Sequence, residues 1–185
     1  MLALPCAISG PLRLRPSPFE DARGVLWVTF QAEEQAALGL PTAFVQENLS
    51  RSVRGALRGL HHQEAEPQGK LLRVLVGEIF DVLVDLRPRS ATVGQVVCLE
   101  LNDQVRESLW IPPGFAHGFY VRSAEALVDY KLTAPYRPED ERVLRWDDPE
   151  LAIPWPLEGP PLLSARDQAG ESLQAWRARL TARGQ

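Results

Sequence analysis

The chain has 185 residues, 45% of them hydrophobic, and a formal net charge of −4 at pH 7. A chain of this length can bury a core large enough to fold without disulfides. Its acidic balance excludes the broad positive surface that binds a nucleic-acid backbone. We therefore expect a single domain over residues 1–185 and no nucleic-acid partner.

Two isolated cysteines, Cys6 and Cys98, are too few for a disulfide framework and lack metal-ligand spacing. Residues 1–9 are apolar, but Pro5 interrupts them and no basic leader precedes them. No stretch of the chain approaches the roughly 18 apolar residues that a membrane helix needs. These features predict a cytoplasmic protein that neither enters nor crosses a membrane.

The 16 prolines and 13 glycines divide the chain into short, strand-like segments. This pattern favours a sandwich or barrel over alternating βα units. One short helix is predicted over Ala32–Leu38, ended by Gly39 and Pro41. In the strand-like run that follows, Gln46 and Asn48 lie on one face and point the same way.

The clearest hairpin signal consists of two strand-like runs, Leu71–Val76 and Ile79–Leu86, with Gly77-Glu78 between them. A two-residue turn with glycine first fits a type II′ geometry. In this register Lys70, Asp81 and Asp85 share one face, and alternate residues from Phe80 to Leu86 pack on the other. The shared face could be the interior of a barrel.

Farther along, a second strand pair is predicted over Val96–Leu101 and Leu127–Leu132. Beyond Pro135 the chain is irregular until a helix from about Ala165 to Leu180. Ser164 and Asp167 have the spacing of a capping box at its start. By spacing alone, Asp167 is therefore a helix cap rather than a catalytic acid.

Three distant segments each place a proton-transfer group at the end of a strand-like run, namely His61, His117 and Tyr130. Histidine changes charge near neutral pH and tyrosine is a weak acid, so together they can move carbon-bound protons. Taken singly, each has a simpler interpretation: a hydrogen-bonded or surface histidine, or a tyrosine that only packs. Lys70 could likewise be a solvated lysine at a sheet edge.

The spacing Pro112-x-Gly114-x-x-His117 also matches the second half-motif of the cupin barrel. A metal-dependent cupin needs His-x-His with a nearby Glu so that several ligands reach one ion. Here the first segment reads His61-His62-Gln63, and neighbouring histidines point to opposite faces of a strand. We therefore expect no metal.

Several longer segments occur together in order: Phe44–Ser52, Leu57–His61, Gln68–Leu71, Phe80–Arg87, Ile111–Phe119, Tyr130-Lys131 and Trp146–Pro149. Over about residues 12 to 173 the chain resembles the dTDP-4-dehydrorhamnose 3,5-epimerase family. The resemblance implies an all-β, cupin-like jelly-roll barrel with a few short helices, assembled as a homodimer without metal or cofactor. It also implies a dTDP-4-keto-6-deoxyhexose substrate on the way to dTDP-L-rhamnose or a related deoxysugar.

The resemblance assigns roles residue by residue. It implies that His61 is the general base, Asp167 the carboxylate that orients it, and Tyr130 the general acid. Lys70 and His117 match pocket residues close to the keto oxygen or the sugar, and Asp81 matches a supporting carboxylate. Nucleotide-binding positions are Arg23, Gln46, Asn48, Arg58 and Glu141. The chain departs from the family at Val28, usually acidic and in contact with the nucleotide, and at His62, usually aromatic.

The chemistry of a 4-keto sugar supports these roles. Both C3 and C5 adjoin the carbonyl, so loss of either proton gives an enolate whose charge rests on O4. A base, a stabiliser for O4 and an acid on the opposite face are then required, which His61, Lys70 and Tyr130 would supply. Open alternatives are epimerisation at one carbon, a 3,4-ketoisomerase, a metal-dependent cupin, and an inactive sugar-nucleotide binding module.

Overall fold

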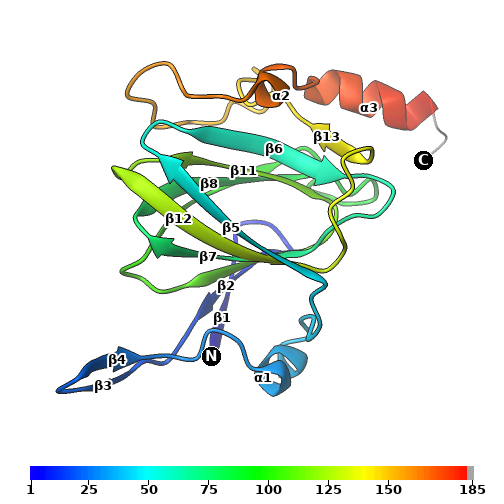
Figure 1. Ribbon diagram of the computed structural model, residues 1–185. Helices are drawn as coiled ribbons and strands as arrows, with labels where there is room; N and C mark the ends of the chain where they lie inside the picture. Colours follow the sequence, from blue (N-terminus) through cyan, green and yellow to red (C-terminus); the bar gives the residue numbers. More distant parts are fainter. Residues whose placement is uncertain (183–185) are drawn as a thin grey trace.

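A computed structural model, which describes residues 1–182, consists mainly of two antiparallel sheets that face each other (Figure 1). The six-stranded sheet contains, in order across it, β1 (Leu2–Pro5), β2 (Leu12–Arg15), β10 (Ser108–Ile111), β7 (Lys70–Val76), β12 (Glu125–Leu132) and β5 (Gln46–Val53). The five-stranded sheet contains β13 (Glu141–Val143), β6 (Leu57–Gln63), β11 (Phe115–Val121), β8 (Glu78–Asp85) and β9 (Val96–Asn102). This is a cupin-like jelly roll, which confirms the predicted fold class. The last three residues of the predicted 1–185 domain lie outside the described part.

The remaining elements are short: the two-stranded hairpin of β3 (Phe19–Asp21) and β4 (Gly24–Leu26), and the helices α1 (Ala32–Ala37), α2 (Ala165–Gln168) and α3 (Leu173–Ala182). The predicted first helix is confirmed. Within residues 1–182, no helix is both long and apolar enough to cross a membrane.

The prediction of one continuous helix from Ala165 to Leu180 was wrong, because the chain leaves the helix after α2. Glu171 instead bonds to the end of the five-stranded sheet, where its carbonyl accepts a hydrogen bond from Arg145 N at 2.8 Å. A side chain at Gly170 would lie 2.8 Å from that same nitrogen. The glycine therefore permits the close approach that interrupts the helix.

The predicted hairpin over residues 71–86 was also wrong, because β7 and β8 belong to different sheets. β7 pairs with β10 and β12, whereas β8 pairs with β9 and β11. Gly77 has φ +85° and donates its backbone N–H to Asp103 at 2.8 Å. A side chain there would collide with the carbonyl oxygen of Glu125. A tight hairpin and a corner between sheets both need glycine at positive φ, so the local signal is the same.

Another expected pairing differs in the structure. The strands predicted over Val96–Leu101 and Leu127–Leu132 exist as β9 and β12, but they do not pair with each other. Both strands could be predicted from the sequence, but their neighbours in the sheets could not.

The facing sheets still bring Lys70 and Asp81 close, as the charge of Asp81 acts on the Lys70 ammonium. Asp85 does not join them. Its carboxylate is buried and accepts hydrogen bonds from Arg87, Ser90 and Thr92 at 2.9, 2.6 and 2.7 Å. These bonds hold the loop after β8 and outweigh burial, so they keep the pKa of Asp85 far below its usual range.

The hydrophobic core has two main parts. One fills the space between the sheets and includes Leu72, Leu83 and Phe119. The other lies on the outer face of the five-stranded sheet, where Phe80, Val82, Val84 and Leu86 pack as predicted. Trp176 packs against this face, and α3, which carries it, lies beyond the five-stranded sheet (Figure 1). The interior core leaves polar side chains around a cavity between the two sheets.

Candidate active site

A cavity of about 350 Å³ opens between the two sheets and gathers most of the predicted site residues. Those that line it are Gln46, Asn48, Arg58, His61, Lys70, His117, Tyr130 and Glu141. They come from strands of both sheets, so residues separated along the chain meet in one place. Asp167 and Asp81 stand behind this lining and support it, as described below.

The first supporting contact joins His61 and Asp167. His61 Nε2 lies 2.6 Å from Asp167 Oδ1, while the His61 side chain remains 30% exposed. Burial disfavours the Asp167 carboxylate, but hydrogen bonds from His61 and Ser164 outweigh it and hold the pKa of Asp167 below its usual range. An ionised carboxylate only accepts hydrogen bonds, so Nε2 carries the proton and Nδ1 is left as the basic nitrogen.

Asp167 is also the helix cap that its spacing predicted. Ser164 precedes α2 and accepts a hydrogen bond from Asp167 N at 3.1 Å. The Ser164 hydroxyl donates to Asp167 Oδ2 at 2.7 Å. The other carboxylate oxygen faces His61. The cap therefore fixes the side chain that orients the imidazole, and the two interpretations of Asp167 are compatible.

A second histidine–carboxylate pair lies deeper in the cavity. His117 Nε2 donates to Asp81 Oδ2 at 2.8 Å, and both side chains are buried. Burial lowers the pKa of His117, although Asp81 acts against this. His117 is therefore a neutral imidazole at pH 7, suited to donating or accepting a hydrogen bond inside the pocket.

Lys70 provides a buried cation in the same cavity. Burial lowers its pKa to about 8, against the attraction of Glu141 and Asp81. The ammonium form still dominates at pH 7. Lysine at this position is therefore no solvated edge residue, and its charge is available to a ligand in the pocket.

Tyr130 approaches the cavity from β12 of the six-stranded sheet, opposite the β6 strand that carries His61. Burial raises its pKa above the usual value, against a hydrogen bond with Asn48. The phenol is therefore protonated at pH 7 and can act as an acid. The arrangement places a base and an acid on opposite walls of one cavity.

The remaining lining residues form a polar rim. Gln46 Nε2 donates to Asn48 Oδ1 at 3.0 Å, which confirms that the two point together. Arg58 Nε donates to Ser52 Oγ at 2.9 Å, and the other guanidinium nitrogens form no hydrogen bond within residues 1–182. Gln46 also accepts a hydrogen bond from Tyr136 N at 2.9 Å. Amide groups are suited to binding a nucleobase, and a guanidinium is suited to binding a diphosphate.

Four residues of this region were missed by the sequence analysis as site residues. Gln68, Phe119 and Tyr136 line the cavity, and Arg166 contacts Tyr136 and Glu141 at its edge. Tyr136 lies in the irregular segment after β12, where no periodic pattern predicts the side-chain direction. For Arg166, the one feature of the sequence that could have predicted a place at the site was its position next to Asp167.

Arg23 does not lie with the other predicted residues. Its side chain is 89% exposed and pairs with Asp21 on the β3–β4 hairpin. Figure 1 shows this hairpin projecting away from the two sheets. Arg23 therefore does not line the cavity of its own chain. Val28 follows the hairpin and is also exposed.

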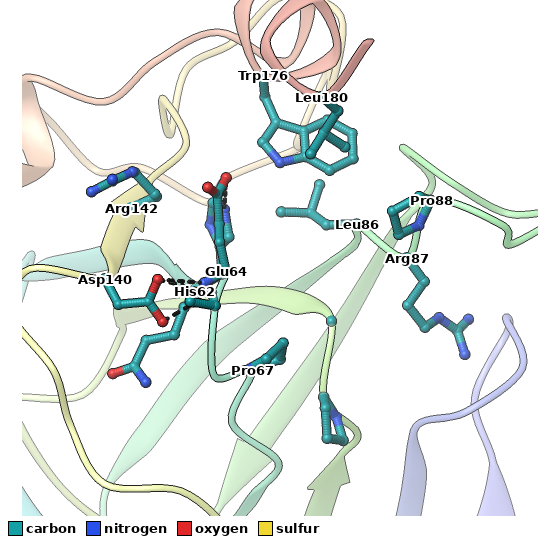
Figure 2. Close-up of a pocket in the computed structure, with 14 residues that line it drawn as sticks. His62, Glu64, Pro67, Leu86, Arg87, Pro88, Asp140, Arg142, Trp176 and Leu180 are labelled. Carbon is teal, nitrogen blue, oxygen red and sulfur yellow. Dashed lines mark hydrogen bonds and ion pairs between the residues drawn. The ribbon is translucent and has the colours of Figure 1, made fainter. Parts of the chain in front are cut away.

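His62 faces away from the site, as expected for the neighbour of His61 on a strand. It lines a separate cavity of about 640 Å³. Figure 2 shows this cavity with Trp176 and Leu86 among its lining residues. Burial lowers the pKa of His62 to about 4, so it is neutral at pH 7 despite Glu64 at 3.6 Å. This larger cavity holds none of the predicted catalytic groups.

The structure also bears on the metal question. Among residues 1–182, no group of three or more His, Cys, Asp or Glu side chains is arranged to hold a metal ion. His61 and His117 line the same cavity, and each has its Nε2 oriented by a carboxylate. In the described part of the chain, these two imidazoles do not belong to a group of three such ligands.

The fold and the pocket have the features of a cupin-like acid–base enzyme. Comparison with known proteins makes this specific, since a family model described as dTDP-4-dehydrorhamnose 3,5-epimerase matches residues 5–175. The chain belongs to this family. A Pseudomonas aeruginosa protein named dTDP-4-dehydrorhamnose 3,5-epimerase is 47% identical over 173 residues, covering 93% of this chain and 96% of the relative.

Two solved structures are also similar to this chain. A dTDP-6-deoxy-D-glucose-3,5-epimerase from Legionella pneumophila, in complex with dTDP-4-keto-L-rhamnose, has a TM-score of 0.92 and 44% identity. The match covers 97% of this chain and 96% of that one. A 3′-monoepimerase from Streptomyces bikiniensis, in complex with dTDP-quinovose, has a TM-score of 0.85 and 30% identity, with coverage of 96% and 97%.

Proposed function

We propose that the protein inverts C3 and C5 of a dTDP-4-keto-6-deoxyhexose by acid–base catalysis, without metal or cofactor, in the biosynthesis of dTDP-L-rhamnose or a related deoxysugar. One observation carries the proposal above all. His61 and Tyr130 face one cavity from opposite sheets. Inversion requires this, because a proton is removed from one face of a carbon and returned to the other.

In the first step, His61 Nδ1 accepts the proton from C3 or C5 while Asp167 stabilises the resulting imidazolium through Nε2. The C–H electron pair forms the enolate double bond, and the carbonyl electrons move to O4. Lys70 and His117 face the cavity and supply positive charge and a hydrogen bond to that oxygen. Stabilising developing charge of this kind often contributes about 3 kcal/mol.

In the second step, Tyr130 donates its phenolic proton to the enolate carbon on the opposite face. The electrons on O4 restore the carbonyl, and the phenolate regains a proton from solvent before the next turnover. The raised pKa of Tyr130 ensures that the donor is protonated at neutral pH. No oxidant or reductant enters either step.

The polar rim supports recognition of the nucleotide part of the substrate. Arg58 supplies a guanidinium for the diphosphate, and Gln46 and Asn48 supply paired amides. Glu141 completes this set at the cavity edge. Because the side chain of Val28 is aliphatic, recognition of the nucleobase is left to these polar groups.

A second candidate is epimerisation at one carbon, which the likeness to the Streptomyces bikiniensis 3′-monoepimerase favours. The same base and acid would serve, and the position of the sugar would decide which carbon reacts. A 3,4-ketoisomerase would use the same enolate with a different proton return. These outcomes differ in the product rather than in the catalytic groups.

One experiment separates the candidates. The protein is incubated with dTDP-4-keto-6-deoxy-glucose in heavy water, and NMR records which carbons take up deuterium. Uptake at C3 and C5 supports the double epimerase, uptake at C3 alone supports the monoepimerase, and a ketone at C3 supports the isomerase. An unaltered substrate would refute the proposed function. A parallel reaction with EDTA tests the metal-dependent alternative, which requires loss of activity.

We also propose that the protein is a homodimer in which Arg23 acts in the partner's site. The β3–β4 hairpin projects from the body and exposes Phe19 and Leu26, at 67% and 65%. Exposed apolar side chains on a projecting segment are typical of an interface. Since Arg23 cannot line its own cavity, a nucleotide-binding role requires a second subunit.

The cellular location is a further proposal. Cys6 and Cys98 are both free thiols. Free cysteines are typical of a reducing compartment. We infer a cytoplasmic enzyme, and fractionation of cells that express the tagged chain would test this.

A further inference from the structure

Lys70 is surrounded by charged and titratable groups from both sheets. Its neighbours in the cavity and behind it are His61 and Arg58 of β6, Asp81 of β8, His117 of β11, Tyr130 of β12 and Glu141 of β13. Two of these, Asp81 and Glu141, are carboxylates whose charge acts on the ammonium. Within residues 1–182, the Lys70 Nζ nevertheless forms one hydrogen bond, a long one of 3.5 Å to the His61 carbonyl oxygen.

Both carboxylates are held by other groups. Asp81 Oδ2 accepts from His117 Nε2 at 2.8 Å. Glu141 Oε2 forms an ion pair with Arg166 and accepts from the Tyr136 hydroxyl at 3.2 Å. One oxygen of each carboxylate near Lys70 is therefore bound to a different partner, while Asp81 Oδ1 is buried without a hydrogen bond among the described residues. The ammonium is buried and remains without an ion pair among the described residues.

Arg166 is itself anchored at the edge of the cavity. Its Nη1 donates to the Tyr136 hydroxyl at 2.8 Å, and its Nη2 donates to the Pro138 carbonyl at 3.1 Å. It precedes Asp167 on α2, so one short helix carries both the arginine and the carboxylate that orients His61. The guanidinium fork is suited to holding a carboxylate in a fixed direction.

We propose that Arg166 is a positioning residue that holds Glu141 away from Lys70 and thereby keeps the lysine charge free for the substrate oxygen. The inference rests on the proposed role of Lys70 at O4. Without the guanidinium, the Glu141 carboxylate turns toward the buried ammonium and pairs with it. The lysine then stays charged, but its charge is neutralised where the enolate needs it.

The composition of the chain allows a direct test without substrate. Lys70 and Lys131 are its two lysines. Protein labelled with ¹³C at lysine therefore gives two Cε signals in NMR, which Lys131→Arg assigns. The pKa of Lys70 is read from the Cε shift against pH in the full chain. In Arg166→Met we expect it to rise by about one pH unit, because a carboxylate comes into contact with the ammonium.

Two further variants isolate the cause. Arg142 donates to the backbone carbonyl oxygen of Glu141 at 3.1 Å, so Arg142→Met removes an equal charge nearby and leaves the Glu141 carboxylate in place. We expect no comparable rise in Arg142→Met, and none in the double variant Arg166→Met, Glu141→Gln. An unchanged Lys70 pKa in Arg166→Met, or an equal rise in Arg142→Met, would overturn the proposal.

Turnover provides a second reading. In Arg166→Met we expect kcat to fall roughly 10-fold, and the decline of activity at high pH to move upward with the Lys70 pKa. A merely structural role for Arg166 would lower activity without moving that decline. Because the NMR titration uses no substrate, it distinguishes failure of this inference from failure of the proposed epimerase function. If the wild-type protein has no epimerase activity, only the proposed epimerase function is refuted.

Discussion

His61 and Tyr130 line one cavity from opposite sheets of the barrel, His61 from β6 and Tyr130 from β12. Neither strand pairs with the other, so the two side chains meet only because the sheets face each other. This relationship gives base and acid separate faces of the substrate. Their removal should therefore have different consequences.

His61→Asn should abolish exchange at both C3 and C5, because a single base starts either inversion. We expect a loss of about 100- to 10,000-fold in deuterium uptake, measured by NMR with the dTDP-4-keto-6-deoxy sugar in heavy water. Circular dichroism and thermal unfolding of the variant provide the control for folding. Uptake at the wild-type rate would remove His61 from the mechanism.

Tyr130→Phe should separate proton removal from inversion. The ring and most of its packing survive, so His61 still removes the proton and deuterium still enters the substrate. Inverted product should fall by about 100- to 10,000-fold, because the donor on the opposite face is gone. Equal losses of uptake and product would indicate a collapsed pocket. Unchanged product would show that Tyr130 only packs.

Asp167→Asn should lower both activity and stability at neutral pH. Hydrogen bonds to the ionised carboxylate depress the pKa of Asp167, so its stabilisation is present above the unfolded value near 4 and is lost as the pH falls below it. We expect a loss of about 1–3 kcal/mol in the free energy of unfolding at pH 7. Urea titrations at pH 7 and pH 3 measure this, and the difference between wild type and variant should shrink at pH 3. An equal difference at both values would contradict the argument.

Lys70→Met should stabilise the protein and weaken catalysis. Burial lowers the pKa of Lys70 to about 8, so the folded state binds fewer protons than the unfolded state between pH 8 and the usual lysine value. Wild-type stability should rise with pH through that window, and the variant should lack this rise. At pH 7 we expect the variant to gain roughly 1–3 kcal/mol in unfolding free energy and to lose about 100-fold in kcat. Urea unfolding and turnover measure the two effects, and a destabilised, fully active variant would refute both.

Mixing two inactive variants tests the proposed dimer. If Arg23 acts in the partner's site, a heterodimer of Arg23→Ala and His61→Asn subunits contains one intact site. After denaturation and joint refolding, random pairing should restore about a quarter of wild-type activity. Sedimentation of the wild type at micromolar concentration checks the assembly itself. A monomer, or no recovery despite mixed dimers, would count against the proposal.

Local signals in the sequence determined much of this protein. Glycine and proline spacing marked the strand segments and the all-β class, and the Ala32–Leu38 helix followed from its stop signals. Strand alternation placed His61 and His62 on opposite faces and Gln46 beside Asn48. These properties depend on residues close in the chain, whose side-chain directions the backbone fixes.

Tertiary structure alone decided which strands are neighbours. Gly77 turns a corner between sheets rather than closing a hairpin, because its local conformation fits either outcome and long-range pairing chooses between them. The same long-range packing brought Arg166 to Glu141 and placed Arg23 on a projecting hairpin outside its own cavity. The spacing of residues along the chain gives no distance between separate sheets. The residues that face one cavity across the barrel could therefore be identified from the motifs, but only the fold decided their positions.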